Sequence, residues 1–224
     1  MFRKLIFIAT VSWSTLVHAQ EKDLGLWSGA TFEYEVNERI ELKLAPELRF
    51  EENISRVGNV FGELSGSYKV SERISASATY RFGQRNKLDY FQTRQRLQFE
   101  LGYKYKFENW TLGYAVRYQK TLQGNFSDSD PDFETVLRNK FSIKYTKIKK
   151  TDISTGWEFF HDGEAEGGLV WQNWRATIEV ERKLNKRNLI SVGYLIQKDL
   201  VSSVPSLDYI FLVGYTHIIK KKKE

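Results

Sequence analysis

Residue types that could catalyse hydrolysis occur together at one place in the sequence. His161 lies three residues after Glu158 and directly before Asp162, and Ser154 lies further upstream. A lipid hydrolase needs a serine nucleophile beside a histidine that a third group orients. No recognised lipase or protease motif surrounds these residues, so we predict no catalytic residue and interpret His161 as a polar residue at the base of a loop.

A second segment has the alternating acidic residues of a calcium-binding loop, because residues 128–132 are Asp-Ser-Asp-Pro-Asp. The sixth position of such a loop is glycine and the twelfth is glutamate. Here Phe133 and Asn139 occupy those positions. We therefore predict no metal site and no cofactor. We interpret the segment as a solvated acidic outer loop, with weak bridging of divalent cations to lipopolysaccharide as the alternative.

Charged residues on one face of a series of alternating segments form the largest group that could do chemistry. Acidic residues gather on the early and late segments, and basic residues gather on the middle ones. The acidic group comprises Glu33, Glu35, Glu41, Glu47, Glu51, Glu63, Glu158, Glu179 and Glu181. The basic group comprises Arg81, Arg94, Arg96, Lys104, Arg117, Arg138, Lys140 and Lys144. In a closed barrel the first and last strands are neighbours, so we predict an acidic wall that faces a basic wall across the lumen.

Two interpretations of these walls follow. The first is a salt-bridged interior with little water, which stabilises the barrel. The second is a narrow polar pore with a transverse electric field. We favour the first, because a barrel only somewhat wider than eight strands can be largely filled by arginine and glutamate side chains.

The elements that must position these charges are β-strands. The clearest example is the hairpin of residues 95–119, where apolar or aromatic residues alternate with polar or small ones along both arms. Its apolar face comprises Leu97, Phe99, Leu101, Tyr103, Tyr105, Trp110, Leu112, Tyr114, Val116 and Tyr118. A period of two predicts strands with two different faces. Arms of about ten residues match a tilted crossing of a membrane.

Alternation elsewhere raises the number of predicted strands to about eleven. They lie at residues 26–36, 40–51, 57–70, 74–82, 97–106, 110–119, 137–145, 153–159, 171–180, 189–197 and 209–219. Short and longer connections alternate, as in barrels with short periplasmic turns and longer outer loops. Single-chain bacterial barrels usually have an even number of strands, so either one strand is missed or merged, or the first segment does not pair fully, and we expect the error in residues 20–29. The predicted fold is all-β: an antiparallel, transmembrane up-and-down β-barrel of about 10–12 strands.

The first residues have the features of an export signal. Arg3 and Lys4 precede a mostly apolar stretch at residues 5–17, and small residues at the cleavage positions end at Ala19. We predict a signal peptide at residues 1–19 and one barrel domain at residues 20–224. The sequence has no cysteine, so neither a lipoprotein anchor nor a disulfide is expected.

The export signal, followed by no apolar run of helix-spanning length, predicts the outer membrane of a Gram-negative bacterium. In lipid, only a closed barrel satisfies the edges of its strands. The predicted partners are outer-membrane lipid and the barrel-assembly machinery, and the oligomeric state is left open. The formal net charge of +6 would suit a nucleic acid. We predict no such partner, because the chain is exported and its charges are distributed along alternating strands.

Aromatic residues at both ends of the apolar faces favour a membrane barrel over a soluble lipocalin-like barrel, whose apolar face points inward. Near the short turns lie Tyr34, Tyr68, Tyr105, Trp110 and Tyr145. Near the longer loops lie Phe50, Phe82 and Tyr118. Two aromatic girdles that flank an aliphatic band are typical of the two headgroup interfaces.

Three stretches carry a resemblance to a known family. They are residues 26–29 (Leu-Trp-Ser-Gly), residues 33–37 (Glu-Tyr-Glu-Val-Asn) and residues 44–50 (Leu-Ala-Pro-Glu-Leu-Arg-Phe). They resemble the start of an uncharacterised Bacteroidota family, domain of unknown function 2490, and the similarity extends over the whole mature chain. The resemblance implies an outer-membrane barrel and no known activity.

Together these observations predict an outer-membrane barrel of undetermined activity with a structural or interaction role and a lumen filled by charges. A small-solute, porin-like pore is the alternative, and a lipid-modifying enzyme is a third possibility that we favour less. Conductance in a planar bilayer would separate the first two.

Overall fold

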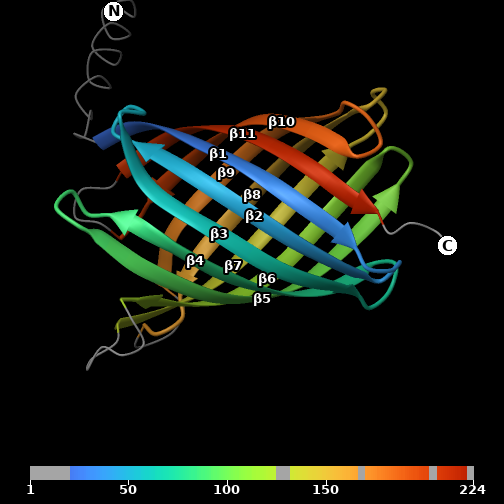
Figure 1. Ribbon diagram of the computed structural model, residues 1–224. Helices are drawn as coiled ribbons and strands as arrows, with labels where there is room; N and C mark the ends of the chain where they lie inside the picture. The colour runs from blue at the N-terminus through green and yellow to red at the C-terminus, as the bar shows by residue number, and fades with distance from the viewer. Residues whose placement is uncertain (1–20, 125–131, 166–169, 202–205, 221–224) are drawn as a thin grey trace, which may run out of the picture.

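The computed structural model describes residues 21–124, 132–165, 170–201 and 206–220, and in these ranges the regular structure is entirely β-strand (Figure 1). The strands are β1 (Glu21–Glu35), β2 (Ile40–Glu51), β3 (Arg56–Lys69), β4 (Ile74–Asn86), β5 (Phe91–Phe107), β6 (Trp110–Gln123), β7 (Asp132–Tyr145), β8 (Thr151–Asp162), β9 (Val170–Lys183), β10 (Asn188–Asp199) and β11 (Ser206–Lys220). They form one closed barrel in chain order, so the predicted fold class is confirmed. Within the described ranges, no helix is long and apolar enough to cross a membrane.

Alternation along each strand sets which side chains point outward. In β2, Leu42, Leu44 and Leu48 are exposed, whereas Lys43 and Glu47 between them are half-buried. Side chains of successive strand residues point to opposite faces, so one face becomes apolar and outer while the other becomes polar and inner. This arrangement is the reverse of a lipocalin-like barrel, in which the apolar face lines the interior.

Hydrogen-bonded turns close one end of the barrel, which we call the short-turn end. In three of them a side-chain oxygen accepts hydrogen bonds from the backbone N–H groups two and three residues later. The accepting residues are Asn37, Ser71 and Asn185. Such side-chain-capped turns reverse the chain within few residues. At the opposite end, which we call the long-loop end, β2, β4, β6, β8 and β10 end.

The strands reach further toward the long-loop end than the sequence analysis predicts. The strands predicted at residues 74–82, 110–119 and 153–159 were expected to end in longer connections. However, β4 continues to Asn86, β6 continues to Gln123 and β8 continues to Asp162. The ladder persists because each extra residue finds a partner on the next strand, for example Arg85 opposite Gln92.

The barrel closes through a parallel seam between β1 and β11, while all other neighbouring strands are antiparallel (Figure 1). The register runs without a break from Glu21 opposite Ser206 to Glu35 opposite Lys220. The expectation of an even strand number, with a poorly paired first segment, is therefore wrong. An odd number can close because the first and last strands run in the same direction. As a result, β1 and β11 both start at the long-loop end.

This seam can be tested by cross-linking, because the chain contains no cysteine. Thr31 and Thr216 are register partners that point into the lumen. We expect the double variant Thr31→Cys, Thr216→Cys to form an intramolecular disulfide on mild oxidation, since partners on adjacent strands lie within disulfide reach. Mass spectrometry of the oxidised protein would detect it. The matched control, Thr31→Cys with Gly214→Cys, displaces the second thiol by about 6.6 Å along β11 and should not cross-link. Preferential cross-linking of the control pair would contradict the register.

Candidate binding site in the barrel lumen

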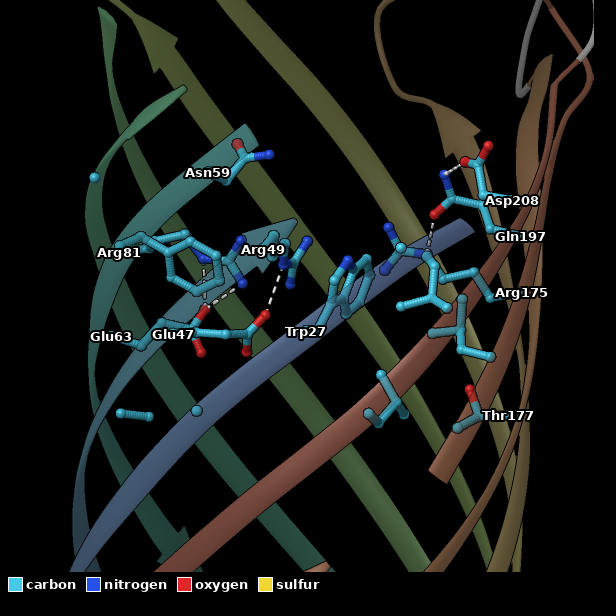
Figure 2. Close-up of a pocket in the computed structure, with 18 of the residues that line it drawn as sticks. Trp27, Glu47, Arg49, Asn59, Glu63, Arg81, Arg175, Thr177, Gln197 and Asp208 are labelled. Atoms are coloured by element: carbon cyan, nitrogen blue, oxygen red, sulfur yellow. Dashed lines mark hydrogen bonds and ion pairs between the residues drawn. The ribbon is translucent and has the colours of Figure 1, made fainter. Parts of the chain in front are cut away.

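A polar cavity of about 1300 Å³ occupies much of the lumen. Its lining extends from Asp23, Arg85 and Asp208 at the long-loop end to Thr31 and Thr216 beyond the middle of the strands. Figure 2 shows how side chains from β1 to β4 and from β9 to β11 converge on it. The interior is therefore not filled throughout by charged side chains.

Most of the charged residues that we singled out line this cavity. They are Glu47, Glu51, Glu63, Glu158, Glu179, Glu181, Arg81, Arg94, Arg96, Arg117, Arg138 and Lys140. The remaining ones, Glu33, Glu35, Glu41, Lys104 and Lys144, lie nearer the short turns and outside the cavity lining. Lys104 is exposed near the end of β5, so it does not belong to the cavity wall.

Ion pairs run around the wall of the lumen, not across it. They join the same or adjacent strands at Arg49–Glu47 (2.6 Å), Arg81–Glu63 (2.7 Å), Arg117–Glu100 (2.6 Å), Lys140–Glu158 (3.2 Å) and Arg138–Glu158. Arg49 and Arg175 lie on strands that we expected to be acidic, and Glu100 lies on a strand that we expected to be basic. These three residues depart from the predicted division into an acidic and a basic wall, and the ion pairs join residues of the same or adjacent strands.

Two lysine-centred clusters occupy the lumen near the short-turn end. Lys43 Nζ lies 2.6 Å from Glu33 and 3.1 Å from Glu41. Lys144 Nζ lies 2.8 Å from Asp152 and 3.7 Å from Glu181, which is two strands away. These clusters are the part of the structure that corresponds to the predicted charge-filled lumen.

A layer of stacked arginine and aromatic side chains lies in the cavity wall. The Arg49 guanidinium carbon lies 3.5 Å from the ring centroid of Trp27, and that of Arg81 lies 3.7 Å from Phe61. Figure 2 shows Trp27 between Arg49 and Arg175. Phe160 continues the layer between Arg175 (4.6 Å) and Arg138 (4.4 Å). Cation–π contacts of this kind hold guanidinium groups in fixed positions.

Sequence reasoning missed five members of this layer: Trp27, Arg49, Phe61, Phe160 and Arg175. One signal was available, because the three aromatic residues fall on the polar face of their strands. A large ring at an inward position breaks the alternation and indicates packing inside the barrel.

Three cavity-lining arginines make hydrogen bonds to neutral side chains and, among the described residues, form no ion pair. Arg94 Nη2 donates to Gln123 Oε1 at 2.7 Å. Arg96 Nε donates to Thr121 Oγ1 at 2.9 Å. Arg175 Nε donates to Gln197 Oε1 at 2.5 Å, and Gln197 in turn donates to Asp208. The lumen therefore holds positive charge that the described carboxylates do not pair.

The structure places His161 as the penultimate residue of β8, next to the connection that follows, but its side chain is buried in the strand and is not part of a loop. A register shift between Phe160 and His161 turns the histidine toward Trp171, whose ring centroid lies 4.8 Å away. Glu158 is engaged with Arg138 and Lys140. Of the calcium-like segment, residues 128–131 lie outside the described residues.

Comparison with known proteins gives one family match. A family model described as "Protein of unknown function (DUF2490)" matches residues 24–204, from β1 to the connection before β11. No curated protein matches the chain.

Proposed function

Because this chain belongs to the DUF2490 family, whose function is unknown, we propose from its own geometry that it is an outer-membrane β-barrel that binds a small solute in its lumen. The solute enters from the long-loop end. The observation that carries the proposal is the pairing of an apolar outer surface with a polar inner cavity.

Every strand contributes a large exposed apolar or aromatic side chain to the outer surface. Examples in strand order are Phe32, Leu44, Leu64, Tyr80, Leu101, Leu112, Phe141, Trp157, Ile178, Val192 and Phe211. Leu64 and Leu101 are 59% and 65% exposed. Apolar surface on this scale is unfavourable in water, whereas a hydrocarbon environment removes the cost. A closed barrel also leaves no unpaired strand edge in that environment.

Exposed aromatic residues lie toward both ends of the strands. Tyr34, Tyr68, Tyr105 and Trp110 lie near the short turns, and Phe82, Tyr118 and Trp171 lie nearer the long loops. Tyrosine and tryptophan favour the headgroup region, so their placement supports a barrel that spans one bilayer.

The features of the lumen favour binding of a solute over free passage of solutes through the barrel. The cavity holds enough volume for a small organic molecule, because ligand pockets commonly measure about 300–1,000 Å³. At the short-turn end, however, the Lys43 and Lys144 clusters place ion-paired side chains in the cross-section. The proposal includes no catalytic step.

We expect the protein to fractionate with outer membranes and to migrate faster on a gel before boiling than after it, because closed barrels resist detergent until heated. Fractionation of cells that express the full chain, followed by paired boiled and unboiled samples, checks both expectations. Recovery of the protein in the soluble periplasmic fraction would contradict the membrane location.

Conductance separates binding from a pore, which the size of the cavity would also allow. In planar bilayers we expect the purified protein to show low conductance, since the short-turn end is ion-paired. High and steady conductance of the unmodified protein would replace the binding proposal by a small-solute pore.

A further inference from the structure

We propose that the lumen contains a binding site for a multivalent oxyanion, in particular a phosphate monoester. Arg96 and Arg175 are its central residues, and Arg49, Arg81 and Arg138 surround them. This inference rests on the proposed function in one respect: the cavity must be accessible from the long-loop end.

The strand register brings like charges together. Arg81 is the register partner of Arg96, and Arg117 is the register partner of Arg138. Directly opposed residues on antiparallel strands are close neighbours, and opposed like charges destabilise a sheet. Neighbouring glutamates form ion pairs with Arg81, Arg117 and Arg138, whereas Arg96, among the described residues, donates its side-chain hydrogen bond to the neutral hydroxyl of Thr121. This arrangement suits an anion that is supplied from outside the chain.

Charge balance around the site also favours an anion. The five arginines and Lys140 form ion pairs with the carboxylates of Glu47, Glu63 and Glu158, and those of Glu134 and Asp208 lie within electrostatic range of Arg96 and Arg175. Arg175 lies within electrostatic range of Arg138, Arg49 and Arg96. Arg96 lies within range of Arg81, Arg138 and Arg49. Guanidinium groups from five different strands therefore converge on one region of the lumen.

Aromatic rings hold the guanidinium groups of four of these arginines in place: Arg49, Arg81, Arg138 and Arg175. Trp27, Phe61 and Phe160 contact the flat faces of the arginines in the layer. Stacking occupies the face of a guanidinium and leaves its N–H edge available. Such an edge binds two oxygens of a phosphate at once, which explains why arginine suits phosphate recognition. The geometry thus resembles a set of donors fixed in advance around a multivalent oxyanion.

Charges of both signs line the long-loop end of the cavity, where Asp23, Glu51 and Asp208 lie beside cationic side chains. Arg85 and Arg94 line the cavity nearer the long-loop end, and Arg94 precedes Arg96 by two residues on the same face of β5. The buried Nε of Arg94 has no hydrogen-bond partner among the described residues.

The wall between Trp27 and Arg175 favours an ester over inorganic phosphate. Leu195 on β10 and Ile210 and Leu212 on β11 line the cavity there, and Leu195 and Ile210 are each only 5% exposed. This apolar surface can contact the organic part of a monoester while the arginines bind its phosphate. A free ester and a lipid phosphate headgroup share this chemistry.

Calorimetry on the purified full chain, in detergent without phosphate groups, tests the site with phenyl phosphate and lysophosphatidate as probes. We expect the double variant Arg96→Gln, Arg175→Gln to bind at least about tenfold more weakly, which corresponds to one charge-assisted hydrogen bond. The matched control, Lys104→Gln with Lys106→Gln, makes the same change in net charge at two exposed residues outside the cavity lining and should bind like the wild type. Binding of phenyl phosphate assigns a soluble ester, and binding of lysophosphatidate alone assigns a lipid headgroup.

A second readout separates a binding role from a structural one. Without ligand, the single variant Arg96→Gln should unfold at or above the wild-type temperature, because the Arg81–Arg96 repulsion is removed. A lower temperature would assign Arg96 a structural role and count against the proposal. Binding of neither probe, or equal loss in the arginine variant and the lysine control, would overturn it. Fractionation and heat-modified migration do not depend on Arg96, so failure of the membrane proposal remains distinguishable.

Discussion

Arginine in place of Leu101 should lower the free energy of unfolding in a lipid bilayer by about 2–4 kcal/mol, the range for a cationic side chain at the midplane of a membrane barrel. Leu101 points outward from β5 between Ala76 on β4 and Val116 on β6, and it is 65% exposed. In hydrocarbon, the new guanidinium group would have no water and no partner. Denaturant titration of the barrel in vesicles, followed by heat-modified gel migration, would measure the loss.

The matched control for this change is Thr79→Arg on β4. Thr79 points into the lumen, where its hydroxyl donates a hydrogen bond to Ser65 Oγ at 2.9 Å. Arginine there would reach a wet, polar interior, so the cost should be clearly smaller than at Leu101. Leu42 and Leu112, also exposed and outward, should behave like Leu101. Equal or reversed costs would show that Leu101 does not face lipid.

Alternation made the strands and their facing predictable from the sequence. Each predicted strand overlaps one observed strand, because side-chain parity along a strand is a local property that needs no knowledge of neighbours. Pairing that depends on a neighbouring strand was less predictable. The extensions of β4, β6 and β8 at the long-loop end follow from cross-strand partners, which the polar residues there do not reveal.

The seam between β1 and β11 is a stronger example of pairing that the sequence did not predict. Residues 20–29 alternate weakly, since Gly25, Ser28 and Gly29 interrupt the apolar pattern. The segment nevertheless pairs along its whole length with β11, at a sequence separation that spans nearly the entire chain. Parallel closure is a property of the completed barrel, so it could not be predicted from the pattern of each strand taken alone.

The lumen residues show a similar division. The alternating pattern predicted that charged residues such as Glu63, Arg96 and Arg138 lie on the inner face of the barrel, and these three line the cavity. The alternation of inward and outward side chains does not predict which charges form ion pairs. The strand register decides whether a glutamate or a second arginine lies opposite a given arginine. The stacked layer depends in addition on contacts between strands that are distant in sequence, such as Trp27 on β1 and Arg175 on β9.

The register brings three lumen cations to the carboxylate of Glu158. It accepts a hydrogen bond from Arg138, lies 3.2 Å from Lys140 and is the register partner of Arg175. Its side chain and that of Arg138 are only 14% and 9% exposed. Removal of a carboxylate at this point leaves three cations without it, in a part of the lumen that already holds excess positive charge.

We therefore expect Glu158→Gln to lower the free energy of unfolding by about 3 kcal/mol, the lower end of the range for a broken buried pair, because the adjacent cavity admits water. Denaturant titration in vesicles measures this loss. Glu179→Gln is the matched control, since Glu179 lines the same cavity opposite Ser154 and Gly193 and should contribute much less. The double variant Glu158→Gln, Arg138→Gln should recover part of the loss, because the most buried of the stranded cations is then also gone. Equal losses at Glu158 and Glu179, with no recovery in the double variant, would mean that Glu158 stabilises the barrel by packing and not by its charge.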